Sequence, residues 1–280
     1  MYVADRFVFV ELHKTGGTHI STCLARLAPG KQVGKHNRVP PALRDRFVIG
    51  SVRNPWDWYV SLWGYGCDGK GAVFRTVTRG LDVGYLLRDL GIEMGSSGYA
   101  VLRQAVADLQ RPAAAWRRLY RDVSDAGAFR EWLQMMMDIP RRYDVAEGFG
   151  FSPVSRWAGI LTFRYLKLFT TLDARLYTDT TLATEAGART AWATHRLVRG
   201  IIRTEHLEED LIDALNRAGY ALTQEQCAAV RARRHTRTNT SRRRAASYYY
   251  DAASIDLIAR REALIIGEHG YVPPAADGAA

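Results

Sequence analysis

The chain has 280 residues, of which 47% are apolar and 24% are charged, a balance typical of a folded globular protein rather than a disordered one. Its formal net charge of +10 favours an anionic partner: a nucleic acid, an anionic lipid or a small ligand with several phosphates. No stretch reaches the ~18–20 apolar residues of a membrane span, and the first apolar run lacks the basic leader and cleavage site of a signal peptide. The three cysteines (Cys23, Cys67 and Cys227) lie too far apart for a disulfide framework or a zinc site, so we expect a cytoplasmic protein without a transmembrane segment.

The first sixty residues alternate between strand and helix patterns. Residues 7–12 form a short continuous apolar run, typical of a strand buried on both faces of a parallel sheet. A glycine pair follows, and then apolar residues at helical spacing (Ile20, Cys23, Leu24 and Leu27). Residues 47–52 are a second buried run, and Asn54-Pro55 after it is a helix-start signal. Two adjacent parallel strands joined through a helix are the expected result.

The rest of the chain is less regular. Residues 66–98 are rich in glycine and predict loops with one short helix, and residues 99–137 predict helices broken at Pro112 and around Gly127. Residues 148–157 predict a loop, 198–202 a strand, 205–218 a helix that stops at Gly219, and 252–267 a final helix. We therefore predict one α/β domain over residues 1–280: a central parallel sheet flanked by helices, with a mainly helical and loop region at about 66–195.

The most informative segment is the loop from Leu12 to His19, which lies between a predicted strand and a predicted helix. At such a junction the backbone N–H groups and the helix dipole favour an anion, and Gly16 and Gly17 let the backbone approach it closely. Lys14 adds a positive charge. In the phosphate loop of nucleoside triphosphatases the lysine follows the last glycine, whereas here it precedes the glycines.

This loop resembles the 5'-phosphosulfate loop of the sulfotransferase superfamily, which often reads Pro-Lys-Thr-Gly-Gly-Thr; His13 stands where the family commonly has proline. A second segment, residues 52–61, is similar to the family's 3'-phosphate motif, in which a serine follows the arginine of Arg-Asn-Pro by eight residues. A softer resemblance covers Arg203-Thr204-Glu205-His206-Leu207 and the acidic helix start that follows. About half the chain is covered, and residues 66–195 match no part of the family.

The resemblance implies a phosphate-loop-like sulfotransferase fold that binds 3'-phosphoadenosine 5'-phosphosulfate, with the bisphosphate as product and no metal. Lys14 would then hold the phosphosulfate and neutralise the leaving oxygen, and Arg53 and Ser61 would hold the 3'-phosphate. The remaining donor contacts would come from Thr15, Gly16, Gly17, Thr18 and His19. From the basic stretch at 231–244, Arg242 is the residue we expect to reach the nucleotide, although a solvated basic surface explains that stretch equally well.

The candidate general base is His36, which lies in the sequence Gly34-Lys35-His36. The heparan sulfate 6-O-sulfotransferases, to whose loop this chain is similar, carry their proposed base in a comparable Gly-x-His segment. An imidazole can take the proton of an acceptor hydroxyl as that hydroxyl attacks sulfur. His13 and His19 are rivals because they adjoin the loop, and Glu11, on a buried strand, is a weaker candidate.

These residues together predict an enzyme that transfers a sulfuryl group to a hydroxyl or amine of a carbohydrate or small natural product. The region at about 66–195 would cover the acceptor cleft. A phosphate-loop kinase is one alternative, and a non-catalytic relative that binds a nucleotide or polyanion is another. No nucleic-acid-binding motif accompanies the basic stretch, and the pattern fixes neither the acceptor nor the oligomeric state.

Overall fold

The computed structural model describes residues 1–81, 84, 98–145, 147–233 and 243–275. It divides into two compact units, which we treat one at a time. The first unit comprises Met1–Asn54, Arg164–Thr171 and Thr194–Thr240, and the second comprises Pro55–Phe163, Leu172–Ala193 and Ser241–Ala280. Of the helices in the described ranges, none combines the length and the apolar character that crossing a membrane requires.

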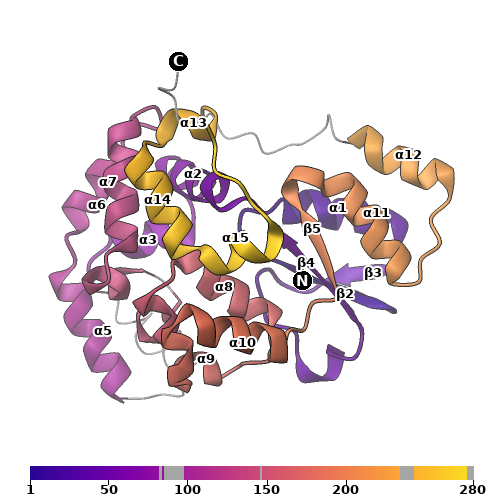
Figure 1. The fold of residues 1–280 in the computed structure, drawn as a ribbon, viewed down its shortest axis with the longest axis horizontal. Helices are drawn as coiled ribbons and strands as arrows, with labels where there is room; N and C mark the ends of the chain where they lie inside the picture. Colours follow the sequence, from indigo (N-terminus) through magenta and orange to yellow (C-terminus); the bar gives the residue numbers. More distant parts are fainter. Residues whose placement is uncertain (82–83, 85–97, 146, 234–242, 276–280) are drawn as a thin grey trace. The chain divides into compact units, whose positions relative to one another are not determined.

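The first unit is built on a five-stranded mixed sheet with the order β3-β1-β2-β4-β5 (Figure 1). The strands are β1 (Tyr2–Ala4), β2 (Phe7–Glu11), β3 (Gly30–Gln32), β4 (Phe47–Val52) and β5 (Gly200–Arg203). β2, β4 and β5 are parallel, as predicted, whereas β1 pairs antiparallel with both β2 and β3. The expectation of a wholly parallel sheet is therefore wrong. Only Asp5 and Arg6 separate β1 from β2, and so short a turn can join only antiparallel strands.

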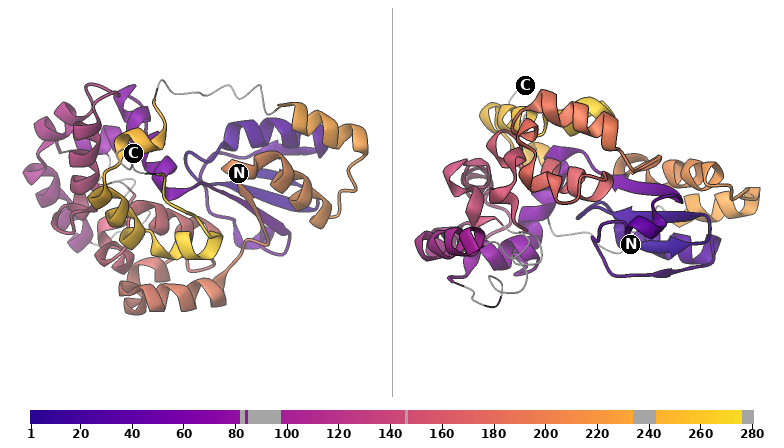
Figure 2. Two further views of the ribbon diagram at one scale, coloured as in Figure 1. Left: turned by 45° about the horizontal axis from the view of Figure 1, so that its top comes forward. Right: turned by 90° about the horizontal axis from the view of Figure 1, so that it is seen from below.

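Helices cover the sheet because its central strands, β2 and β4, are apolar on both faces; every residue of β2 is buried. On one face, Phe7, Phe9 and Ile49 share a core with α1 (Gly17–Leu27) and α11 (Leu207–Arg217). On the other face Gly50 leaves room for a ring: a Cβ atom there would lie 2.7 Å from Cζ of Phe169, at the end of α8 (Ile160–Phe169). The views in Figures 1 and 2 let the reader follow α1 and α11 beside the strands. The remaining helical elements of this unit are η1 (Pro41–Leu43), η7 (Thr204–His206) and α12 (Gln224–Ala232).

The second unit is helical in its described part. Its longer helices are α2 (Pro55–Cys67), α3 (Ala72–Thr78), α5 (Gly98–Gln110), α6 (Ala113–Leu119), α7 (Ala126–Met137), α10 (Glu185–His195), α14 (Ala252–Arg261) and α15 (Ala263–His269). Short turns complete it: η3 (Pro140–Asp144), η4 (Phe149–Phe151), η5 (Pro153–Arg156), α9 (Arg175–Thr178), η6 (Thr180–Ala183) and α13 (Ala246–Tyr249). α8 begins in this unit and ends in the first, and α10 does the same.

Aromatic side chains make the core of the second unit. Trp63 packs edge-on against Phe129 and Tyr249, with ring centroids 5.4 and 5.6 Å apart, and its indole donates to the Leu119 carbonyl at 3.0 Å. Trp132 donates to the Tyr120 hydroxyl at 2.6 Å. The tryptophans of α2 are almost completely buried. Buried indoles and phenols therefore keep their polar atoms paired, which makes a large aromatic core stable.

Most predicted elements are confirmed near their predicted bounds, with two corrections. The break predicted around Gly127 lies a little earlier, at residues 120–125, because Asp125 accepts from the backbone N–H of Ala128 at 2.8 Å and starts α7 before the glycine. The single final helix is wrong: Glu262, with φ −122°, separates α14 from α15. The assignment of residues 1–280 to one domain stays a prediction.

Candidate functional site

The loop between β2 and α1 has the backbone of an anion cradle. Lys14 and Gly16 both have left-handed backbones, with φ of 63° and 78°, and α1 starts immediately after them. Left-handed residues in such a turn direct neighbouring N–H groups toward one point, and the helix N-terminus adds partial positive charge. The loop predicted from Lys14 to His19 is therefore correctly located at a strand-to-helix junction.

Gly17, the first residue of α1, lies against the side chain of Glu11. A Cβ atom at position 17 would be 2.0 Å from Oε2 of Glu11 and 2.8 Å from its Cβ, so only glycine fits. Glu11 is 3% exposed and is the last residue of β2. Its carboxylate thus lies beside a helix N-terminus, where the macrodipole stabilises negative charge.

Hydroxyl groups attach the loop to the neighbouring strand. Oγ1 of Thr15 donates to the Leu12 carbonyl at 2.6 Å and lies 2.6 Å from Oγ of Ser51, in β4. Both side chains are completely buried, and Ser51 is the register partner of Glu11. The hydroxyl of Thr15 therefore holds the loop in place, and the backbone N–H is the group of Thr15 that suits ligand binding.

Arg53 reaches the loop from the end of β4. Its Nη1 donates to the Lys14 carbonyl at 3.4 Å, so the arginine of the second motif contacts the lysine of the first. The next residue is fixed too, because the Asn54 backbone N–H donates to Oε1 of Glu205 at 2.8 Å. Thr204 donates to the Val52 carbonyl at 2.9 Å. The carboxyl ends of β2, β4 and β5 are thus connected at one edge of the sheet.

The residues of the softer resemblance have structural roles at this edge. Arg203 forms a forked ion pair with Asp210, with N–O distances of 2.8 and 2.9 Å. Leu207 packs on the loop, since a Cβ atom at Gly16 would lie 3.2 Å from its Cδ1. Together with Glu205 they fix the end of β5 and the start of α11 next to the cradle.

His36 lies beside the loop with a defined ring orientation. Its Nδ1 is 3.0 Å from the Glu11 carbonyl oxygen, and its ring stacks on His13 with centroids 3.5 Å apart. A carbonyl oxygen carries no proton, so Nδ1 of His36 must donate, and in the neutral imidazole Nε2 then has the lone pair. This tautomer is the one that a general base needs. His13 stacks on the proposed base, and His19 lies in the first turn of α1, partly exposed.

Lys35 is a cation at the loop that sequence reasoning missed. Its Nζ donates to Oγ1 of Thr18 at 3.4 Å, and both side chains are exposed. The residue stands next to His36 in the sequence, and this adjacency to a candidate base was the available signal. Lys14, Lys35 and Arg53 therefore bring three cations to the loop, beside the buried carboxylate of Glu11.

In the second unit, Ser61 lies on α2 and is 5% exposed. Arg243 runs along this helix: its Nη1 donates to the Asp57 carbonyl at 3.3 Å and its Cδ is 3.8 Å from a Cβ built at Gly64. Positions 57, 61 and 64 fall on one helix face, so Arg243 lies over the face that carries Ser61. Burial lowers the pKa of Arg243. Arg242 is outside the described residues, and the convergence of Arg53 with Ser61 stays a prediction because they belong to different units.

No family model matches this chain, and neither does any curated protein or solved structure that was compared with it. The likeness to sulfotransferases is thus carried by the residues of the two motifs. The geometry defines an α/β unit with a basic, glycine-containing strand-to-helix loop and a histidine beside it. Such a site suits an anionic ligand that bears several phosphate or sulfate oxygens.

Proposed function

We propose that the chain is a sulfotransferase that uses 3'-phosphoadenosine 5'-phosphosulfate as its donor and acts in the cytoplasm. The observation that carries the proposal is the contact from Arg53 to the Lys14 carbonyl. The two motifs that resemble the donor-binding motifs of the family stand 39 residues apart in sequence and lie at one edge of the sheet. A donor with anionic groups at both ends needs cations that are grouped in this way.

The residues present fit such a donor. The left-handed backbones at Lys14 and Gly16, with the start of α1, form a cradle suited to the phosphosulfate. Lys14 and Lys35 would neutralise charge there, and Arg53 would hold the 3'-phosphate through its planar guanidinium. Ser61, the serine of the second motif, is the further candidate for that phosphate, and within its own unit Arg243 lies over the helix face that carries Ser61. The donor supplies the activated sulfuryl group, and the protein supplies position and charge.

The proposed reaction is a direct displacement at sulfur. The acceptor oxygen forms a bond to sulfur while the bond from sulfur to the phosphate oxygen breaks. The acceptor's proton passes to Nε2 of His36, and the electron pair of the broken bond stays on the phosphate oxygen beside Lys14. The Nδ1 of His36 faces the Glu11 carbonyl, so in the neutral ring Nε2 is the nitrogen that can take this proton. Metal-free transfer and a hydroxyl or amine acceptor, carbohydrate or small natural product, belong to this proposal.

The test is transfer of label from sulfur-labelled donor to fractionated acceptors, together with calorimetric binding of the desulfated bisphosphate. Lys14→Ala is expected to lose transfer and to weaken bisphosphate binding. His36→Ala is expected to lose transfer and to keep the binding. Lys31→Ala and His269→Ala serve as controls, because Lys31 is exposed on β3 and His269 lies at the end of α15.

The outcomes separate the alternatives. Tight binding of the bisphosphate with no transfer to any acceptor fraction would identify a non-catalytic relative. Magnesium-dependent transfer from a nucleoside triphosphate would identify a kinase. Unchanged turnover in His36→Ala would remove the base assignment alone, whereas unchanged bisphosphate binding in Lys14→Ala would refute the donor site.

A further inference from the structure

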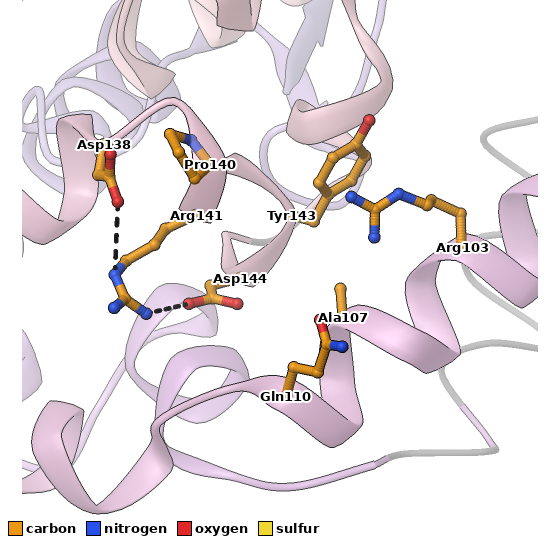
Figure 3. A pocket seen from close by; sticks show the side chains of 8 residues that line it. All are labelled: Arg103, Ala107, Gln110, Asp138, Pro140, Arg141, Tyr143 and Asp144. Carbon is orange, nitrogen blue, oxygen red and sulfur yellow. Dashed lines mark ion pairs between the residues drawn. The ribbon is translucent and has the colours of Figure 1, made fainter.

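The second unit contains a polar pocket of about 220 Å³ that the donor site does not use. One side is formed by Arg103, Ala107 and Gln110 of α5 and the other by residues from Asp138 to Asp144 (Figure 3). All the residues that line it are described and belong to this unit. One water molecule needs only ~10–15 Å³ of this volume, so the pocket admits a small ligand.

Asp144 is the buried carboxylate of the pocket, and its hydrogen bonding is incomplete. Its side chain is 8% exposed, and Oδ2 accepts one long hydrogen bond, from the Trp116 indole at 3.3 Å. Its cationic neighbours are farther away: Arg111 Nε at 3.8 Å from Oδ1 and Arg141 Nη1 at 3.9 Å from Oδ2. These distances exceed the 2.7–3.2 Å of N–H···O bonds. The two arginines therefore compensate the charge of Asp144, but they leave its oxygens able to accept further hydrogen bonds.

Two further observations concern the surroundings of this carboxylate. The Nε atom of Arg111 is buried and makes no hydrogen bond to the described residues, although it faces the same carboxylate. Burial raises the pKa of Asp144, while Arg111, Trp116 and Arg141 lower it. A largely buried carboxylate with one long hydrogen bond gains free energy from a hydroxyl that donates to it, because burial has removed most of the water around the group.

The other polar groups of the pocket are placed to bind a ligand with many hydrogen-bonding groups. Nε of Arg141 lies 3.5 Å from Oδ2 of Asp138, again too long for a good hydrogen bond. The Arg103 guanidinium lies over the ring of Tyr143, 4.3 Å from its centroid, which fixes the guanidinium at the pocket. Figure 3 shows the chain of ion pairs from Asp138 through Arg141 to Asp144, with Gln110 on the α5 side.

The charges of the lining residues cancel: Arg103 and Arg141 against Asp138 and Asp144. An anion would meet the two carboxylates and a cation would meet the two guanidinium groups. A neutral hydroxyl both donates and accepts, so it can satisfy each of these side chains. We propose that this pocket binds a neutral polyhydroxylated molecule of about the size of one monosaccharide, with Asp144 accepting from one of its hydroxyls.

The experiment compares three probes of similar size and different charge: D-glucose, D-glucuronate and D-glucosamine. Binding to the full chain is measured by saturation-transfer NMR and calorimetry. D-Glucose is expected to bind with a millimolar Kd, and the two charged sugars about tenfold more weakly. Equal or tighter binding of D-glucosamine would refute a site for neutral ligands, and so would equal or tighter binding of D-glucuronate. Absence of binding by D-glucose would refute the proposal as a whole.

Variants locate the site. Asp144→Asn is expected to weaken D-glucose binding about tenfold, because an amide oxygen is a weaker acceptor than a carboxylate. Gln110→Ala, at an exposed position, is expected to weaken it about threefold with the fold intact, and Gln224→Ala on α12 is the matched control. Unchanged affinity in Gln110→Ala and in Asp138→Asn, each shown to be folded by its melting temperature, would contradict the assignment. None of these measurements depends on the proposed donor site.

Discussion

Replacing Glu262 with glutamine is expected to change how the stability of the protein depends on pH. Glu262 is completely buried between α14 and α15. Its Oε2 accepts from the N–H of Thr162 at 2.9 Å and from the hydroxyl of that residue at 2.6 Å, and its Oε1 accepts from the Tyr59 hydroxyl. Burial nevertheless raises the pKa of Glu262 from 4.5 to about 7, because these donors and Arg261 only partly replace water.

The size of the expected change in stability follows from the difference between the unfolded and folded pKa values of Glu262. Between the unfolded and folded pKa values, the folded state binds more protons, so the free energy of unfolding falls as the pH rises through that window. The stabilisation is complete below the unfolded pKa of 4.5 and has been lost once the pH passes about 7. The difference between pKa values of 4.5 and about 7 for Glu262 corresponds to about 3 kcal/mol of stability.

The assay is urea unfolding, followed by tryptophan fluorescence at several pH values. Glutamine stays neutral, can accept from Thr162 and can donate to Tyr59. The stability of Glu262→Gln relative to the original chain is therefore expected to rise by about 3 kcal/mol between about pH 4.5 and pH 8. The other titrating groups contribute equally to the stability of both proteins, so their contributions cancel when the two are compared. Glu268→Gln, at an exposed site on α15, is the control and should show no such trend. A difference that stays constant with pH would refute the reasoning.

Two further substitutions test the loop. Gly17→Ala places a Cβ atom 2.8 Å from that of Glu11 and is expected to cost about 1–3 kcal/mol of stability and most bisphosphate binding, whereas Gly98→Ala, with no atom within 4 Å of the new Cβ, should cost little. Equal melting temperatures for these two variants would contradict the close packing. Arg53→Lys keeps the charge and removes the fork, so calorimetry should show about tenfold weaker bisphosphate binding with little change in stability. The exposed Arg26→Lys is its control, and an equal affinity in both variants would show that the fork is not used.

The parts of the fold that the sequence predicts are those with a strong local pattern. The apolar runs of β2 and β4 and the spacing in α1 need no tertiary information. β1 and β3 have three residues each, too few for a periodicity, and the antiparallel pairing of β1 with β3 joins segments that are distant in sequence. The break at Glu262 is hidden because the apolar pattern continues through it, while a buried carboxylate and the Thr162 N–H decide the geometry.

In the candidate site, too, the sequence predicts the residues that belong to a local pattern and misses those brought together by the fold. Lys14, Gly16 and Arg53 were recognisable because their order and spacing resemble known motifs. The contact from Lys35 to Thr18 and that from Arg243 to Asp57 join residues 17 and 186 positions apart, which no local pattern reveals. Thr15 was predicted to give a donor contact, but its hydroxyl bonds inward, because strand pairing brings Ser51 beside it.

One end of the sheet has a consequence for the behaviour of the protein at high concentration. β3 is the edge strand; it has three residues, all exposed, and Lys31 stands at its centre. A long, flat, uncharged edge strand would pair with a strand of another molecule and start aggregation. The short strand β3 offers few backbone groups for pairing. If β3 of a second copy paired with it in antiparallel register, the two Lys31 side chains would lie close together and repel each other. Lys31→Val should therefore make concentrated samples more prone to precipitate.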